Sequence, residues 1–200
     1  MSKYQYDNKH LPFGHSAAIN DANVLNAMQN INLDQFSNID INKQFCQAYL
    51  DWIKQHPHNT TGLDNFKYAV YSNGTSEAFD KKKKKNLNRR FRIFISYPFA
   101  DTGNKHEQMD FILHNCSTLN IPVLIDCAYY TISSELDFNF NHKCITDITF
   151  SLSKTFPVAH ARIGMRLTKE DNDDTLFVYE KANYQNRLGA ILGLELINNF

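Results

Sequence analysis

The residues best suited to chemistry in this 200-residue chain begin with one lysine and one arginine. The stretch "SLSKTFPVAHARIG" (151–164) places Lys154 among small hydroxyl side chains and Arg162 eight residues later. A lysine in half-apolar surroundings can act as a free amine and attack a carbonyl carbon, whereas an arginine suits a bidentate grip on phosphate. A single lysine at a strand end is most often only solvated, so this stretch alone does not define a site.

Two further stretches hold complementary groups. "SNGTSEA" (72–78) reads as a strand turning into a helix, where the backbone N–H groups of Gly74, Thr75 and Ser76 can cradle a phosphate at the helix N-terminus. "IPVLIDCAYY" (121–130) is a continuous apolar run that meets a carboxylate, Asp126. Taken singly, such a turn is usually only a turn, and such an aspartate is often a helix cap or a structural partner.

The elements that must position these groups alternate between helices and strands. Apolar periodicity predicts helices over 22–36, 40–55, 104–120 and about 174–197, and strands over 66–74, 91–98, 121–130, 144–153 and 161–168. Such alternation is typical of an α/β domain with a mostly parallel sheet covered by helices. Ligands in such sheets bind beyond the carboxyl ends of the strands, where all three stretches fall. We therefore expect one site at that edge.

Composition narrows the classes of protein. The 21 basic and 21 acidic residues give zero formal net charge, so no overall field favours nucleic acid or a membrane surface. No apolar run approaches the roughly 20 residues of a membrane span, and the start has no signal-peptide core, which predicts a cytoplasmic protein. Four scattered cysteines without zinc-like spacing predict free thiols and no metal site. We interpret the basic run Lys81–Lys85 as a solvated loop.

The three stretches together resemble the class I/II aminotransferases of fold type I, which depend on pyridoxal 5'-phosphate (PLP). "SLSKTFPVAHARIG" is similar to the family segment S-x-S-K-x(7)-R-x-G, "IDCAYY" to D-x-A-Y and "NGTSEA" to the phosphate turn G-[ST]-x-E-A. The resemblance covers roughly residues 66–167. It implies the fold of the large, cofactor-binding domain, with 1–65 forming an N-terminal arm and helices, 66–200 forming the PLP-binding core, and both making one globular unit.

The resemblance also implies a role for each matching residue. Lys154 would form the Schiff base with PLP and move a proton, Asp126 would keep the pyridine nitrogen protonated, and Tyr129 would hydrogen-bond the ring hydroxyl. The residues that would bind the phosphate are Gly74, Thr75, Ser76, Ser151, Ser153 and Arg162. The implied activity is transfer of an amino group between an amino acid, or a related amine, and a 2-oxo acid, in a homodimer.

The sequence departs from the family pattern at several places. Ala100-Asp101-Thr102-Gly103 stands where the family has Asn-Pro-Thr-Gly, and only "FDKKKKKNLNRRF" stands where a longer stretch carries the aromatic that stacks on the cofactor ring. No residue matches the family arginine that grips the substrate carboxylate. Two alternatives therefore stay open: another fold type I reaction, such as a decarboxylase or lyase, and a non-catalytic, truncated remnant of the fold.

The apolar tail bears on assembly. Its aliphatic residues are too many for one solvent-facing stripe: Leu188, Ile191, Leu192, Leu194 and Leu196. The family continues into a small domain beyond this point, whereas the chain ends at Phe200. We therefore expect an exposed apolar surface on the tail helix that pairs the chain into a dimer or makes it aggregate.

Overall fold

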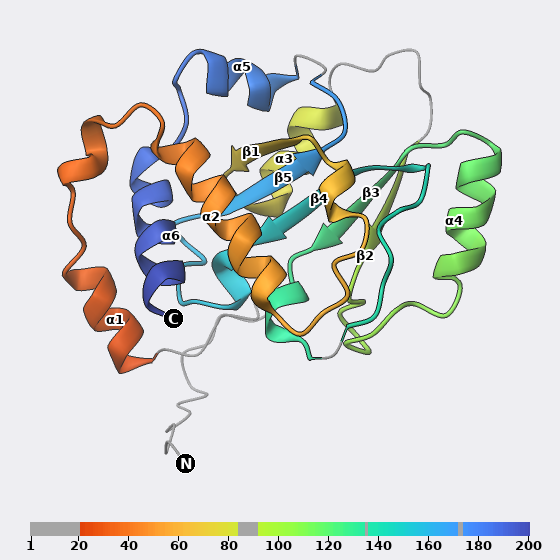
Figure 1. The fold of residues 1–200 in the computed structure, drawn as a ribbon, viewed down its shortest axis with the longest axis horizontal. Coiled ribbons are helices and arrows are strands. Elements are labelled where there is room, and N and C mark those ends of the chain that lie inside the picture. Colours follow the sequence, from red (N-terminus) through yellow and green to blue (C-terminus); the bar gives the residue numbers. More distant parts are fainter. Residues whose placement is uncertain (1–20, 84–91, 135, 172–173) are drawn as a thin grey trace.

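The computed structural model describes residues 21–83, 92–134, 136–171 and 174–200, and within them a five-stranded sheet runs through the molecule (Figure 1). The strands are β1 (Tyr68–Ser72), β2 (Ile93–Ser96), β3 (Val123–Cys127), β4 (Ile145–Ser151) and β5 (Gly164–Thr168), in the spatial order β1-β5-β4-β3-β2. Strands β2, β3 and β4 are parallel, whereas β5 is antiparallel to both of its neighbours, β4 and β1. The predicted α/β class with a mostly parallel sheet is confirmed.

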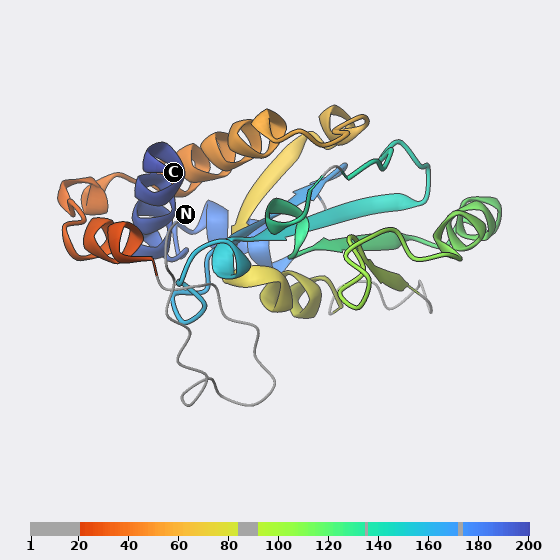
Figure 2. The same ribbon diagram turned by 90° about the horizontal axis from the view of Figure 1, so that it is seen from below.

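Helices cover both faces of this sheet. The helices are α1 (Ala22–Gln29), α2 (Ile41–Gln55), α3 (Gly74–Lys83), α4 (Met109–Thr118), α5 (Thr175–Lys181) and α6 (Arg187–Asn199). Helices α2 and α6 pack together over one face, α3 lies on the opposite face together with α5, and α4 stands beyond β2 at the sheet edge (Figures 1 and 2). No helix in the described ranges has the length and apolar character that a membrane crossing requires.

The two faces of the sheet differ in polarity, because strand residues alternate between them. Apolar side chains such as Ile148 and Phe150 of β4 and Met165 of β5 join the main core beneath α2. On the other face of β1, β4 and β5, several polar side chains are nevertheless buried: Ser72, Asp147, Thr149, Ser151, Arg166 and Thr168. The face toward α3 therefore carries the buried polar side chains of the sheet.

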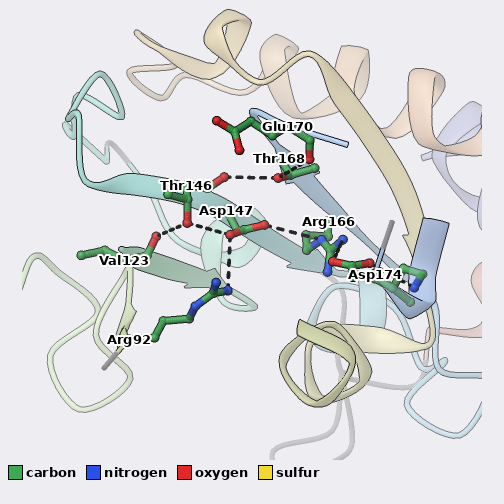
Figure 3. A network of polar contacts seen from close by, with 9 residues as sticks. Arg92, Val123, Thr146, Asp147, Arg166, Thr168, Glu170 and Asp174 are labelled. Atoms are coloured by element: carbon green, nitrogen blue, oxygen red, sulfur yellow. Dashed lines mark hydrogen bonds and ion pairs between the residues drawn. The ribbon is translucent and has the colours of Figure 1, made fainter. Parts of the chain in front are cut away.

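An ionic network holds part of this polar face together (Figure 3). Arg166 of β5 places Nη2 2.6 Å from Oδ2 of Asp174 and Nε 3.7 Å from Oδ1 of Asp147. Arg92 approaches Asp147 from the β2 side at 3.7 Å, and the Thr146 hydroxyl donates a 2.7 Å hydrogen bond to it. Asp174 also accepts the backbone N–H of Leu176 and so caps α5. The network ties α5 to the sheet.

Two predicted helices prove to be divided. Residues 22–36 form α1 and a separate 3-10 turn at Asp34–Ser37. The tail forms α5 and α6 rather than one helix, because Asn183 adopts a left-handed φ of 55° after α5 and Asn186 caps α6 with its side chain. The loop interpretation of the basic run is wrong for Lys81–Lys83, which continue α3; Lys84 and Lys85 lie outside the described residues.

The apolar surface expected on the tail helix is mostly covered, so that expectation is wrong for this helix. Ile191 and Leu196 are buried, Leu192 and Leu194 pack partly against the core, and only Leu188 is half exposed. Helix α2 covers them at close range, since a Cβ added to Gly193 would collide with the Phe45 ring.

The four cysteines are free, as predicted, and all four are buried. They stand on different elements: Cys46 on α2, Cys116 on α4, Cys127 on β3, and Cys144 directly before β4. Burial raises the pKa of the Cys46, Cys116 and Cys127 thiols. These thiols are therefore unreactive in the folded protein, since the thiolate is the nucleophile.

Candidate cofactor site

The residues singled out from the sequence meet at one edge of the sheet. Strands β1, β3 and β4 end there and the antiparallel β5 begins there, so Gly164 pairs with both Ser72 and Ser151. One strand further, Asp126 of β3 pairs with Thr149 of β4. The turn after β1, the carboxylate of β3 and the lysine turn after β4 therefore share this edge.

The turn between β1 and α3 depends on two glycines. Gly74 has a φ of 76°, a left-handed conformation that side chains disfavour. A Cβ on Gly164 would lie 3.1 Å from the Gly74 Cα and 2.5 Å from the Phe150 carbonyl oxygen, so the backbones approach closely. The Asn73 N–H donates a 2.7 Å hydrogen bond to Glu77, which fixes the first turn of α3.

Arg162 lies against this turn and gives it positive charge. Its Nη2 donates a 3.3 Å hydrogen bond to the Ser76 hydroxyl, and a Cβ on Gly74 would come within 2.8 Å of the same nitrogen. Arg162 itself has a φ of 56°, and its carbonyl accepts a 3.4 Å bond from the Tyr71 hydroxyl. An exposed guanidinium, a hydroxyl and a helix N-terminus converge here, which suits an anion such as phosphate. Thr75 stands half-buried in the same first turn.

Ser151 and Ser153 shape the turn that carries Lys154. Their hydroxyl groups lie 2.6 Å apart, and the Ser151 hydroxyl accepts the N–H of Ser153 at 3.3 Å. Ser151 thereby caps the 3-10 turn Leu152–Lys154. Because both hydroxyl groups are buried and bonded to each other, the structure gives them a part in holding the lysine turn.

Lys154 is half-buried and lies against an aromatic ring. Its Nζ is 5.1 Å from the ring centroid of Tyr129, a cation–π distance. Tyr129 directly precedes the 3-10 turn Tyr130–Ile132 after β3. The next residue after the lysine, Thr155, shares a 2.5 Å hydroxyl–hydroxyl hydrogen bond with Thr131. The lysine turn and the tyrosine turn are therefore joined.

Asp126 is a largely desolvated carboxylate beside this lysine. Burial raises its pKa to about 6, while the Ala128 N–H, the Thr149 hydroxyl and the nearby Lys154 act in the opposite direction. The two hydrogen bonds measure 3.1 Å and 3.4 Å. Desolvation outweighs these partners, so the charged form of Asp126 is less stable in the folded protein than in water. A further cation at this edge would stabilise that charged form.

Three threonines of this region escaped the sequence analysis. Thr149 alternates with Ile148 and Phe150, so its polar side chain on the face of Asp126 was a detectable signal. Thr131 and Thr155 are distant in sequence, and nothing in either stretch indicates their contact.

The segment Ala100–Gly103, which departs from the family pattern, is an exposed turn closed by a 2.8 Å bond from the Gly103 N–H to the Phe99 carbonyl. Within the described ranges no three His, Cys, Asp or Glu residues gather as metal ligands.

Comparison with known proteins bears on the fold. No protein-family model matches the chain, and no curated protein matches it in sequence. A PLP-bound C–S lyase from Staphylococcus hominis has a TM-score of 0.60 at 12% identity, covering 92% of this chain and 63% of that one. A probable N-succinyldiaminopimelate aminotransferase from Thermus thermophilus has a TM-score of 0.64 at 12% identity, with coverages of 93% and 67%.

A third similar structure is histidinol-phosphate aminotransferase from Sinorhizobium meliloti in complex with PLP. Its TM-score is 0.57 at 12% identity, covering 93% of this chain and 64% of that one. The present chain thus spans about two thirds of the length of these structures. Over that length, it has the α/β fold of the fold type I PLP enzymes.

Proposed function

We propose that the chain binds PLP at the edge formed by β1, β3, β4 and β5, with Lys154 holding the cofactor, and that it acts as an aminotransferase. The observation that carries the proposal is the convergence of three groups: the Lys154 amine, the desolvated Asp126 carboxylate, and the Arg162–Ser76 anion site on α3. They complement three of the polar parts of PLP: its aldehyde, its ring nitrogen and its phosphate. When bound, PLP supplies an electron sink for a carbanion.

The residues fit this cofactor in charge and in space. A protonated ring nitrogen beside Asp126 favours the carboxylate form and offsets the desolvation that raises its pKa to about 6. The phosphate dianion matches the guanidinium of Arg162 and the positive end of α3. The absence of a side chain at Gly74 leaves room for that guanidinium against the turn.

Each residue would then have a defined task. Lys154 would hold the cofactor through its side-chain amine, and its Nζ would also be the atom that accepts and returns a proton. As the resemblance implies, Asp126 would hold the ring nitrogen protonated, and the Tyr129 hydroxyl would hydrogen-bond the ring hydroxyl. The phosphate would be bound by Arg162, Ser76 and the backbone of Gly74 and Thr75. Ser151 and Ser153 would support the turn that carries Lys154.

A lyase is the second candidate reaction. The Staphylococcus hominis C–S lyase shares the fold over 92% of this chain, so the same fold serves that chemistry in another protein. No residue of this chain matches the family arginine for the substrate carboxylate, so an assay must distinguish the aminotransferase from the lyase.

The family resemblance also supports a cytoplasmic homodimer, in which residues 1–65 and 66–200 of each chain form one unit. Sedimentation measures that assembly.

Covalent labelling tests the proposal. The full chain is incubated with PLP, reduced with borohydride and digested, and we expect a pyridoxyl group on the peptide containing Ser153-Lys154-Thr155. Lys154→Arg should lose that label. Lys54 and Lys105, more exposed lysines paired with Asp64 and Asp110, report adventitious reaction. Label on such lysines alone would overturn the proposal.

Product analysis then separates the two reactions. Amino transfer requires a 2-oxo acid acceptor and returns a new amino acid, whereas a lyase releases its products without an acceptor. Dependence on an added 2-oxo acid, abolished in Lys154→Arg, is the expected result. Turnover that is independent of the acceptor would assign the lyase instead.

A further inference from the structure

Two turns at the candidate site come from different strands. The turn Leu152–Lys154 follows β4 and carries Lys154, and the turn Tyr130–Ile132 follows β3 directly after Tyr129. Thr155 comes immediately after the lysine, and Thr131 stands two residues after the tyrosine. The hydroxyl groups of these threonines hydrogen-bond at 2.5 Å across 24 residues of sequence.

Each turn also has its own internal support. The lysine turn is closed by the Thr155 N–H, which donates to the Leu152 carbonyl at 3.1 Å. The tyrosine turn is closed by the Ser133 hydroxyl, which donates to the Tyr129 carbonyl at 2.9 Å. These bonds fix the shape of each turn, whereas the threonine pair fixes one turn relative to the other.

The relative position of the turns matters because of what each carries. Lysine has a long flexible stem, and Nζ lies 5.1 Å from the Tyr129 ring centroid only while both backbones keep their places. Thr131 and Thr155 are both half-buried, so water competes only in part for their hydroxyl groups. The pair is therefore suited to holding the amine and the ring in register.

We propose that Thr131 and Thr155 are positioning residues that hold the Lys154 amine against Tyr129 and thereby limit its reactivity and exposure until a carbonyl ligand enters. The importance of this for PLP rests on the proposed function, in which Lys154 holds the cofactor. The coupling itself is a property of the chain alone, so it can be measured without PLP.

The experiment follows the reactivity of Lys154 in the full chain without cofactor. An amine-modifying reagent is added in small amounts, and peptide mapping gives the rate at Lys154 relative to Lys54, which lies on α2 and pairs with Asp64 at 2.6 Å. The variants are Thr131→Val, Thr155→Val, their combination, and Thr155→Ser. Thr118→Val on α4 is the matched control, since its hydroxyl bonds the His114 carbonyl within the same helix at 3.0 Å.

We expect each valine variant to speed modification of Lys154 about two- to tenfold, the range set by one hydrogen bond. The double variant should equal the single variants, because each already removes the shared bond. Thr155→Ser should retain the wild-type rate, and Thr118→Val should change nothing. Unchanged rates in the valine variants, additive effects in the double variant, or a serine variant as fast as valine would each overturn the inference.

A second measurement links the pair to the cofactor. Protein loaded with PLP is dialysed, and the valine variants should lose the visible absorbance of bound cofactor faster than wild type, while Thr155→Ser should match it. If wild type takes up no PLP, the proposed function fails, but the labelling rates still decide whether the threonine pair positions Lys154.

Discussion

Two groups of charged residues occupy the polar face of the sheet, and they differ in how their charges are balanced. Arg166 pairs with both Asp147 and Asp174, and the three side chains are at most 1% exposed. At the candidate cofactor site Arg162 is exposed, Lys154 is half-buried, and Asp126 has a pKa raised to about 6 by burial. The first group pairs its charges within the protein, whereas in the second the desolvation of Asp126 outweighs the groups that favour its carboxylate form.

This difference separates a buried ion-pair network that maintains the fold from the residues for which we propose a ligand. Breaking a buried pair is costly because one charge stays behind without its partner. A desolvated carboxylate instead reduces stability while it is charged, and perturbed groups of this kind cluster at functional sites. Removing the buried charge of Arg166 and removing that of Asp126 should therefore have opposite effects on stability.

The largest effect is expected from Arg166→Met. The change leaves Asp147 and Asp174 buried without the guanidinium between them, which should lower the free energy of unfolding by about 3–5 kcal/mol. Urea denaturation measures this loss. Arg162→Met is the matched control: its guanidinium is exposed, so stability should change by less than about 0.5 kcal/mol while PLP binding is lost. Equal losses in both variants would remove the distinction between the two groups.

Asp126→Asn should act in the opposite direction. A folded-state pKa raised to about 6 means that this carboxyl favours folding at low pH, and that the contribution disappears as the pH rises through about 6. The neutral amide avoids that loss, so above pH 7 the variant without cofactor should be more stable than wild type by on the order of 1–3 kcal/mol. Near pH 4 the two proteins should unfold at similar urea concentrations.

The same variant should bind and use PLP poorly, because the amide cannot hold the ring nitrogen protonated. Asn keeps the oxygen that accepts the Ala128 N–H, so the local structure is retained. An Asp126→Asn protein that is no more stable at neutral pH than wild type would show that Asp126 is an ordinary structural partner.

The smallest effect on stability is expected from alanine substitutions at two glycines, Gly74 and Gly103. Gly74 and Gly103 both have left-handed φ values, 76° and 66°, so alanine at either should cost about 1–2 kcal/mol. Only Gly74 faces Arg162, at 2.8 Å from an added Cβ, whereas an added Cβ at Gly103 meets nothing within 4 Å. Gly74→Ala should therefore weaken PLP affinity in addition, as titration would show, and Gly103→Ala should not.

Sequence reasoning succeeded where one local pattern determines the result. Continuous apolar runs placed β3 and the strands around it, and the rule for parallel strand ends brought Asp126 and Lys154 to one edge. It failed where distant residues decide. The Arg166–Asp174 pair, the Thr131–Thr155 bond and the cover that α2 gives to α6 all join segments whose own sequences carry no mark of the partner.

The division of the tail shows a different limit. Apolar spacing continues from α5 into α6, so periodicity favours one helix, but a single residue in the left-handed region, Asn183, ends the first. Asparagine tolerates that conformation without requiring it. In the divided form α6 packs on α2, a contact that the local sequence does not contain.

The buried thiols allow local unfolding of the protein to be followed by alkylation. Each of Cys46, Cys116, Cys127 and Cys144 reports on a different element, and none can be alkylated until that element separates from the core. Cys127 is the next residue after Asp126, so its alkylation rate would measure how fast the candidate cofactor site becomes exposed to solvent. The order in which the four thiols react would show which parts of the fold come apart together, without any introduced probe.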